Sequence, residues 1–310
     1  MRPSRFRGAV AIAAIGGLVL AACAKSANPG TGGTPSAAGS TGAFGVTKDA
    51  TIAAEVPASI ASKGTITVAS DASYAPMEYL ASDNKTVLGA DADIATAVMT
   101  VLGLKANIVN ATFSGIIPGL QAGKYDVSWS SFFDTKTREK VVDMIDYFQA
   151  GSGMFTKASN SATYTSLSQL CGQSVAAEDG TTELDDANAA AKKCGSKTMK
   201  VLHFPSQNSV NLAVVSGRAL VGLADTEVAE YQVKVTNGQV RFAGNYAAAV
   251  LYGIAVPRPS GAAPGSGPLT KPIQDALKKL FDDGTYKKIL DKWGIASGAL
   301  TAPTVNQATS

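Results

Sequence analysis

Apolar residues along this chain follow two spacings in turn, that of a buried β-strand and that of an amphipathic α-helix. Residues 66–69 form an apolar run of strand length, whereas the apolar residues of 93–102 recur every three or four positions, as on one helix face. Gly103 follows where a C-terminal helix cap belongs, and Ser114 can cap a short helix that ends at Gly123. The later segments predicted as strands are 125–130, a stretch from 174 onward and 219–224, and those predicted as helices are 208–216, 273–281 and 286–293.

Strands that alternate with helices indicate an α/β protein with mostly parallel sheets. In such sheets, ligands bind beyond the carboxyl ends of the strands. The polar residues at or just after the ends of predicted strands include Asp71, Ser130, Ser131 and Asp225. They are therefore candidate binding residues, although each could instead be a loop residue that caps the next helix.

The first residues have the pattern of an export signal. Three arginines precede an uncharged apolar stretch, 8–22, that is shorter than the ~20 residues needed to cross a bilayer. It ends in Leu-Ala-Ala before Cys23, so that residues 1–22 resemble a bacterial lipoprotein signal. This resemblance implies cleavage before Cys23 and lipidation of its sulfur, which would anchor the protein to the cell membrane. An ordinary secretory signal with a chance cysteine is the alternative.

The composition beyond the signal predicts a tether and a soluble body. Residues 24–47 are almost all small or polar, and we predict that the lipidated N-terminus and a flexible tether together occupy 23–62. The formal charge of +3 belongs to the whole chain; without the three arginines of the signal, 24 basic residues (27 − 3) face 24 acidic residues. A balanced chain without a long basic run argues against nucleic acid as a partner.

The two cysteines after Cys23 are Cys171 and Cys194, an even pair in an exported protein. We expect a disulfide between them, with two buried free thiols as the alternative. A metal site is the weaker explanation, because His203 is the chain's single histidine and no Cys/His cluster can complete a tetrahedral set.

The body of the chain carries a series of short motifs in the order typical of one family. They are Asp71-Ala72-Ser73-Tyr74-Ala75-Pro76-Met77-Glu78, Gly89-Ala90-Asp91-Ala92-Asp93-Ile94, Phe113-Ser114-Gly115-Ile116-Ile117-Pro118-Gly119-Leu120, Gly123-Lys124-Tyr125-Asp126, Gly180-Thr181-Thr182, Gly217-Arg218 with Asp225 downstream, and Asp283-Gly284-Thr285-Tyr286 before Lys292-Trp293. Through this ordered set the chain resembles the family 3 extracellular solute-binding proteins, which serve polar amino acid ABC importers.

The resemblance implies a two-lobed type 2 periplasmic-binding-protein fold, in which two mostly parallel sheets with flanking helices are joined by a two-strand hinge. The implied parts are lobe 1 at 63–152 and 251–296, lobe 2 at 153–250, and a C-terminal tail at 297–310. The hinge segments would lie near 150–154 and 247–253. The Gly/Pro-rich stretch 257–268 would be a surface excursion of lobe 1.

The resemblance also implies a role for each residue of a ligand site. Arg138 would bind the α-carboxylate of an amino acid with help from Thr182, and a planar guanidinium suits this task because it donates two parallel hydrogen bonds. Asp225 would accept the α-ammonium, and Ser130 and Ser131 would contact the zwitterion. The aromatic rings expected to enclose the ligand side chain are Tyr74 and Phe113, and the acids expected near its far end are Asp71 and Glu178.

Each of these assignments has a plainer alternative. Arg138 could be a surface arginine paired with Glu139 or Asp134, the aromatic rings could be simple core, and Asp225 could be a helix N-cap. The chain also departs from the family pattern, since Phe133 replaces a common serine or threonine, Asp134-Thr135 replaces Ile-Thr, and Gly217-Arg218-Ala219-Leu220 lacks an aspartate.

These features predict an extracytoplasmic, lipid-anchored component of an ABC importer that captures an amino acid and delivers it to a membrane permease. We expect a monomer without a metal or cofactor. One alternative is an enzyme of the same fold, such as a dehydratase with Glu78 or Glu178 as general acid, because fold alone does not determine function. Another is an extracellular lipoprotein that senses a ligand.

Overall fold

The computed structural model describes residues 43–309, so the predicted signal, Cys23 and the first part of the predicted tether lie outside it. The predicted α/β architecture is confirmed, and the main sheet has nine strands in the order β5-β1-β6-β11-β7-β10-β8-β9, with β12 paired to β7. These strands are β1 (Thr65–Ser70), β5 (Lys105–Asn110), β6 (Val127–Phe133), β7 (Val142–Lys157), β8 (Ser174–Glu178), β9 (Lys200–Phe204), β10 (Val221–Asp225), β11 (Val240–Pro257) and β12 (Ala299–Val305). A second, small sheet contains β2 (Ser73–Tyr74), β3 (Glu78–Leu80) and β4 (Val87–Leu88).

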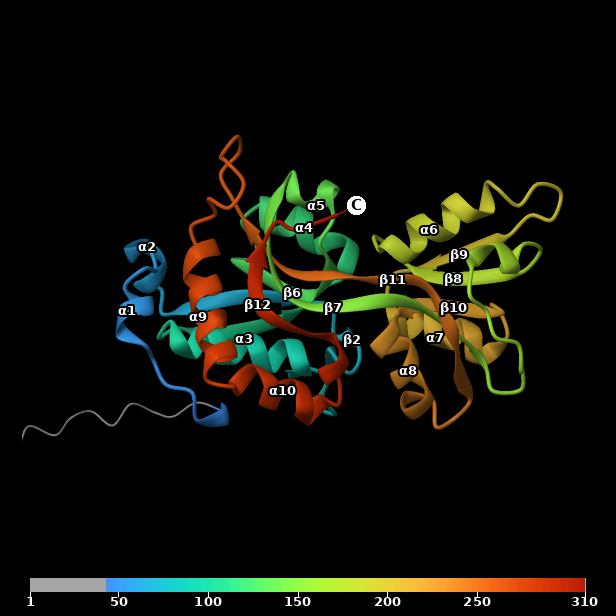
Figure 1. Ribbon diagram of the computed structural model, residues 1–310, viewed down its shortest axis with the longest axis horizontal. Helices are drawn as coiled ribbons and strands as arrows, with labels where there is room; N and C mark the ends of the chain where they lie inside the picture. Colours follow the sequence, from blue (N-terminus) through green and yellow to red (C-terminus); the bar gives the residue numbers. More distant parts are fainter. Residues whose placement is uncertain (1–42, 310) are drawn as a thin grey trace, which may run out of the picture. The chain divides into compact units, whose positions relative to one another are not determined.

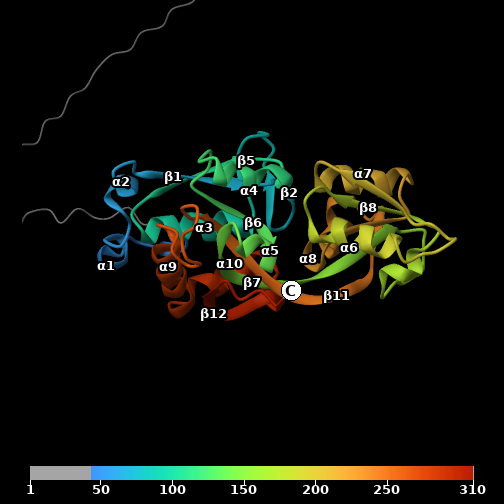
Figure 2. The same cartoon turned by 90° about the horizontal axis from the view of Figure 1, so that it is seen from above.

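Helices pack beside both groups of strands. The α-helices are α1 (Ala50–Ala53), α2 (Ala58–Ala61), α3 (Ala90–Val101), α4 (Phe113–Gln121), α5 (Lys136–Glu139), α6 (Thr182–Ala191), α7 (Gln207–Ser216), α8 (Thr226–Val235), α9 (Thr270–Asp282) and α10 (Thr285–Trp293). Short 3₁₀ turns are η1 (Ala43–Gly45), η2 (Leu167–Leu170) and η3 (Ala296–Gly298). In Figure 2, α6, α7 and α8 gather around β8, whereas α3, α9 and α10 pack against one another beside β1 and β6.

Two long antiparallel strands, β7 with 16 residues and β11 with 18, carry the sheet from one group of strands to the other (Figure 1). On one side β5, β1 and β6 belong to the predicted lobe 1, and on the other β10, β8 and β9 belong to the predicted lobe 2. Within each group the neighbouring strands are parallel. Because both predicted sheets share β7 and β11, their hydrogen bonding continues as one sheet. The predicted hinge segments fall within these two strands, and the β11 register shifts between Ala247 and Val250.

The helices confirm the apolar spacing predicted for them. In α3 the side chains of Ile94, Val98 and Val101 are fully buried, and Gly103 has the positive φ of 69° that a C-terminal cap requires. The helices predicted at 273–281 and 286–293 are also separate, and Gly284 between them has φ 77°. A left-handed backbone of this kind is readily adopted by glycine.

The predicted cap at Ser114 is wrong. Helix α4 begins at Phe113, so its N-cap position is Thr112, two residues before Ser114, and Thr112 makes no side-chain capping bond. Instead, the backbone N–H of Phe113 donates to Oδ2 of Asp71 at 2.8 Å. A carboxylate from a distant segment therefore satisfies a free N–H of the first turn and stabilises the positive end of the helix.

The described part of the predicted tether, 43–62, is packed rather than extended. It forms η1, α1 and α2, and it buries Val46 and Val56. The backbone N–H of Asp49 donates to the carbonyl of Val101 at 2.9 Å. A few apolar residues among small ones are sufficient to dock this segment on α3, so that the predicted tether can extend only to residue 42.

The segment predicted only as a C-terminal tail contains strand β12, which pairs with β7. The hydroxyl of Thr304 donates to Oδ2 of Asp146 at 2.6 Å. None of the helices within 43–309 is long and apolar enough to span a membrane.

The Gly/Pro-rich stretch 257–268 leaves the sheet after β11 and is held by one buried carboxylate. Asp143 accepts hydrogen bonds from Nη1 of Arg258 at 2.9 Å, from the backbone N–H groups of Gly265 and Gly267 at 2.7 Å each, and from the hydroxyl of Thr270 at 2.8 Å. The side chains of Asp143 and Arg258 are 0% and 8% exposed. This loop is therefore anchored at its base.

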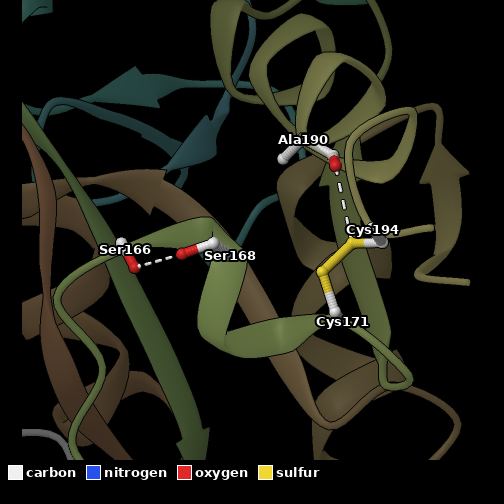
Figure 3. The surroundings of a disulfide bond; sticks show 5 residues. All are labelled: Ser166, Ser168, Cys171, Ala190 and Cys194. Atoms are coloured by element: carbon white, nitrogen blue, oxygen red, sulfur yellow. Dashed lines mark hydrogen bonds between the residues drawn. A yellow bond between two sulfur atoms is a disulfide. The ribbon is translucent and has the colours of Figure 1, made fainter. Parts of the chain in front are cut away.

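Cys171 and Cys194 form a disulfide, as predicted, with 5.4 Å between their Cα atoms and a sequence separation of 23 (Figure 3). The bond joins the end of η2 to the residues after α6. It links the two borders of the segment that contains β8 and α6.

We expect the double substitution Cys171→Ser/Cys194→Ser to lower the free energy of unfolding by about 3 kcal/mol, because the disulfide restricts the unfolded chain. Denaturant unfolding of the oxidised wild type and of the double variant measures the difference. Unfolding curves that coincide, or recovery of both cysteines as alkylatable thiols from unreduced protein, would contradict the prediction.

Candidate functional site

One cavity gathers side chains from the carboxyl ends of several strands. Its twelve lining residues are Asp71, Tyr74, Glu78, Phe113, Ser131, Phe133, Arg138, Glu178, Thr181, Thr182, Glu183 and Asp225. The free volume of the cavity is about 10 Å³, room for about one water molecule. A ligand of amino-acid size can therefore enter only if the cavity opens.

Eight of the nine predicted ligand residues line this cavity, and Ser130 does not. The Ser130 hydroxyl donates to Oε1 of Glu78 at 3.0 Å and accepts from the backbone N–H of Asp71 at 2.8 Å. Ser130 is 1% exposed, and both residues that its hydroxyl contacts belong to the cavity wall, so Ser130 lies behind this wall. The predicted direct contact of Ser130 with a ligand is therefore replaced by support for two acids of the cavity.

Ser131 has an unusual backbone, with φ 49°. Its N–H donates to Oδ2 of Asp91 at 3.0 Å, and its hydroxyl lies 3.3 Å from Oε2 of Glu78. Positive φ in a residue other than glycine costs about 1–3 kcal/mol and often occurs at functional sites. The buried acids that hold Ser131 supply the hydrogen bonds that offset this cost.

Arg138 extends from the single-turn helix α5 into the cavity rather than along the surface. Its Nη1 donates to the carbonyl of Phe133 at 2.7 Å, and its Nη2 donates to the carbonyl of Gly180 at 3.2 Å. The guanidinium carbon lies 4.8 Å from the ring centre of Phe132. Glu139, the partner in the alternative explanation, pairs with Lys136 instead, at 3.0 Å.

The charge and the free N–H groups of Arg138 allow it to bind an anion. Burial lowers the pKa of its guanidinium, and the nearby carboxyl groups of Glu183 and Asp225 oppose this effect. A guanidinium has five N–H donors, of which the carbonyls above engage two. Donors remain for a ligand carboxylate.

Asp225 occupies the N-cap position of α8, but its side chain makes no capping bond. The hydroxyl of Tyr252 donates to Oδ2 of Asp225, while Oδ1 has no partner among residues 43–309. Burial raises the pKa of this carboxyl well above its usual range, and the neighbouring Glu183 raises it further. An unpaired buried oxygen of this kind can accept from a ligand ammonium.

Carboxyl groups outnumber cations in the cavity wall. The acids are Asp71, Glu78, Glu178, Glu183 and Asp225, and Arg138 is the basic side chain among the lining residues. Burial, followed by the charge of Asp71, raises the pKa of Glu178 to about 10. Oε1 of Glu178 has no partner within the described segment. The cavity therefore favours a ligand that brings positive charge.

Glu183 belongs to this wall and was not predicted. It lies in the first turn of α6, is 3% exposed, and accepts from the hydroxyl of Ser152 at 2.7 Å and that of Thr182 at 3.0 Å. Its position directly after Thr182 was the available signal. A first-turn glutamate is also common for helix stability alone, which concealed its place in the cavity.

Glu78 is anchored from behind by a buried network. Both of its oxygens face serine hydroxyls, and burial followed by the charge of Asp91 raises its pKa well above the usual range. The hydroxyl of Tyr147 donates to Oδ1 of Asp91 at 2.6 Å. The carboxyl of Glu78 is thus part of a supported wall.

The predicted aromatic residues also lie in the wall. Tyr74 is 8% exposed, and its hydroxyl accepts from the backbone N–H of Asp225 at 2.9 Å. The ring of Phe113 stacks on that of Phe132 with 4.2 Å between centres. Phe133, the departure from the family pattern, lines the same cavity.

Apart from the bonds that Ser152 and Tyr252 of the two long strands donate to Glu183 and Asp225, three hydrogen bonds join residues of the predicted lobes 1 and 2 at this site. They are Arg138 Nη2 to the Gly180 carbonyl at 3.2 Å, Asp225 N–H to the Tyr74 hydroxyl at 2.9 Å, and Gln207 N–H to the Ser73 hydroxyl at 3.0 Å. The walls of the cavity are therefore in direct contact around it.

Comparisons with known proteins match both groups of strands. Residues 66–296 match the model of the bacterial extracellular solute-binding proteins, family 3. Arginine-binding protein ArgT of Corynebacterium glutamicum is 29% identical over 260 residues, which cover 83% of each chain. An ancestral arginine-binding protein solved with arginine is 33% identical with a TM-score of 0.67, and the match covers 74% of this chain and 98% of that one. An ancestral amino acid-binding protein, a precursor of cyclohexadienyl dehydratase, is 31% identical with a TM-score of 0.65, covering 76% and 97%.

Proposed function

Because this chain belongs to the bacterial extracellular solute-binding proteins of family 3, we propose that it captures a cationic amino acid such as L-arginine for an ABC importer. The observation that most directly supports this proposal is that five carboxyl groups and one guanidinium line a single cavity. A cationic amino acid brings two positive groups and one negative group, so it complements this wall better than a neutral or acidic amino acid. The arginine-binding relatives support the same choice.

The lining residues divide into two sets for such a ligand. Arg138 takes the α-carboxylate with its free donors, and Asp225 takes the α-ammonium through its unpartnered Oδ1. Tyr74 and Phe113 enclose the aliphatic stem, because aromatic faces favour both apolar stems and cations. Asp71 and Glu178 then lie with the distal cation.

Opening and closing of the cavity couple ligand capture to delivery. Arg138 belongs to the proposed lobe 1 and Asp225 to the proposed lobe 2, so a bound zwitterion bridges them and favours the closed form. A ligand shifts such an equilibrium only by its differential affinity, and a shift from 1:99 to 99:1 takes about 5.5 kcal/mol. The closed form would be the one that a membrane permease recognises.

A thermal-shift screen tests the ligand class. L-arginine and L-lysine are expected to raise the melting temperature, because binding to the native state stabilises by RT ln(1 + [L]/Kd). L-glutamine should act less strongly and L-glutamate not at all. Stabilisation by L-glutamate, with no response to either cationic amino acid, would overturn the proposed ligand.

The protein is also proposed to be held at the outer face of the cell membrane through lipid on Cys23. We expect Cys23→Ser to release the protein into the medium, because two acyl chains give stable anchoring and the mature chain has no other apolar stretch of membrane length. Fractionation of cells that express each form measures the change. Wild-type amounts of the variant in the membrane fraction would refute the lipid anchor.

One observation favours the enzymatic alternative, namely the similarity to an ancestral precursor of cyclohexadienyl dehydratase. Glu78 and Glu178 are its candidate general acids, but the oxygens of Glu78 already accept from Ser130 and Ser131. We expect no turnover of prephenate-like acids. Turnover that is lost in Glu178→Gln would instead favour the enzyme.

A further inference from the structure

The carboxyl group of Asp225 is held by the hydroxyl of a tyrosine. Its Oδ2 accepts from the hydroxyl of Tyr252, and no other N–H or O–H group between residues 43 and 309 donates to this carboxyl. Asp225 is 2% exposed, so bulk water cannot easily replace the bond. Tyr252 is not among the residues that line the cavity, whereas Asp225 is. Tyr252 therefore supports a wall residue from outside the cavity.

The ring of Tyr252 is fixed by packing. Tyr252 lies on β11 within the proposed hinge segment 247–253 and is fully buried. Its ring centre lies 5.3 Å from that of Phe133, 5.4 Å from that of Phe148 and 6.2 Å from that of Tyr147. Phe133 and Phe148 are its register partners on β6 and β7, the strands on either side of β11. Close packing of a buried ring leaves it little freedom, so the place of its hydroxyl is set by the sheet.

The carboxyl of Asp225, by contrast, has a side-chain torsion that packing alone does not define. The terminal torsion of an aspartate is broad, because its carboxyl carbon is planar. The backbone N–H of Asp225 donates to the hydroxyl of Tyr74 at 2.9 Å, which places the residue but does not orient its carboxyl. The bond from Tyr252 engages Oδ2 and leaves Oδ1 as the oxygen for a ligand.

The same bond favours the ionised form of the carboxyl. Burial and the charge of Glu183 raise the pKa of Asp225, whereas the hydrogen bond from Tyr252 lowers it. The charged groups that face Asp225 from the elements around it are Arg138 on α5, Glu183 on α6 and Glu227 on α8. An ammonium forms an ion pair only with the ionised carboxylate. The hydroxyl of Tyr252 thus supports the form of Asp225 that such a ligand requires.

Resting on the proposed function, we propose that Tyr252 is a positioning residue, whose hydroxyl orients the Asp225 carboxylate so that Oδ1 meets the α-ammonium of the ligand. Tyr252 contacts no ligand and acts through Asp225. Because it lies in the proposed hinge segment, close to the axis about which the lobes would rotate, it can keep this bond while the cavity opens. Asp225 then meets an entering ligand already oriented, which lowers the cost of binding.

Calorimetric titration of the mature wild type and of Tyr252→Phe tests this role with two ligands. They are L-arginine and 5-guanidinopentanoate, which is L-arginine without its α-ammonium. The substitution removes one oxygen atom and keeps the packed ring. The affinity for L-arginine should fall at least about tenfold, the effect of losing a hydrogen bond to a charged group, whereas the affinity for 5-guanidinopentanoate should fall less than about threefold.

The matched control is Tyr286→Phe. Tyr286 is another buried tyrosine, 3% exposed, and its hydroxyl donates to the backbone carbonyl of Tyr147 at 2.6 Å, but it does not line the cavity. Its substitution should leave both affinities unchanged. If Tyr252→Phe weakens the two ligands equally, or does not weaken L-arginine, the positioning role is overturned and the proposed function stands.

A second measurement is independent of the ligand. If the wild type binds neither L-arginine nor L-lysine, the proposed function fails, and an NMR titration of the Asp225 carboxyl carbon tests the bond alone. The pKa of Asp225 should be higher in Tyr252→Phe than in the wild type, because the variant lacks the donor that favours the ionised form. An equal pKa of Asp225 in the two proteins would overturn the support that Tyr252 gives to it.

Discussion

Arg138→Ala is expected to weaken binding of L-arginine by about 2–5 kcal/mol, the range for removal of one partner from a buried charge pair. The variant leaves the ligand α-carboxylate without a donor in a cavity that has room for about one water. A buried unpaired charge costs more than the net worth of the pair itself. Calorimetry of the wild type and the variant measures the difference.

Two further measurements separate this role from a general effect on folding. Agmatine, which lacks the α-carboxylate, should bind the wild type more weakly than L-arginine does. Its affinity should hardly change in Arg138→Ala. Arg138→Lys should also lose much of the affinity, because a point charge cannot reproduce a two-pronged contact. The control is Arg218→Ala, which removes an exposed guanidinium that lies 5.1 Å from the ring centre of Phe204. If the folded Arg138→Ala protein keeps wild-type affinity, the amino acid assignment fails.

Asp143→Ala is expected to lower the free energy of unfolding by about 3–5 kcal/mol, the usual cost of breaking a buried ion pair from one side. The substitution strands the buried guanidinium of Arg258 and frees two backbone N–H groups of the loop 257–268. Denaturant unfolding measures the loss. Asp282→Ala is the control, because its ion pair with Lys278 is exposed on both sides and should contribute less than about 1 kcal/mol. A loss below about 1 kcal/mol in Asp143→Ala would contradict the anchoring role.

The same carboxylate predicts a pH dependence. Burial tends to raise the pKa of Asp143, but hydrogen bonds from the loop outweigh burial and hold it below its usual range. A carboxyl with a lowered pKa stabilises the folded state above the unfolded pKa of about 3.9 and loses this contribution as pH falls through the folded value. The stability difference between wild type and Asp143→Asn should therefore shrink in acid.

The fold was predictable where local pattern and long-range packing agree. The buried face and C-cap of α3 follow from helical spacing and Gly103, and the alternation of strands and helices predicted the α/β layers. The prediction failed where a local structure depends on residues that are far away in the sequence. Asp71, not a neighbouring serine, satisfies the start of α4, and β12 exists because β7 offers it an edge.

The candidate site shows the same division. The family resemblance identified eight of the residues that line the cavity, and the fold brings their separate segments together. The face that each strand residue points to was not evident near Ser130 and Ser131, where a positive φ interrupts the alternation. Glu183 was missed because a first-turn glutamate has an ordinary local explanation, and its contact with Ser152 spans two separate elements.

Isothermal titration calorimetry of the mature wild-type protein with L-arginine and L-glutamate tests the central claim most directly. We predict saturable binding of L-arginine at one site per chain and no measurable binding of L-glutamate, because the cavity wall carries five carboxyl groups and one guanidinium. No heat of binding with L-arginine, or tighter binding of L-glutamate, would contradict the assignment of this cavity to a cationic amino acid.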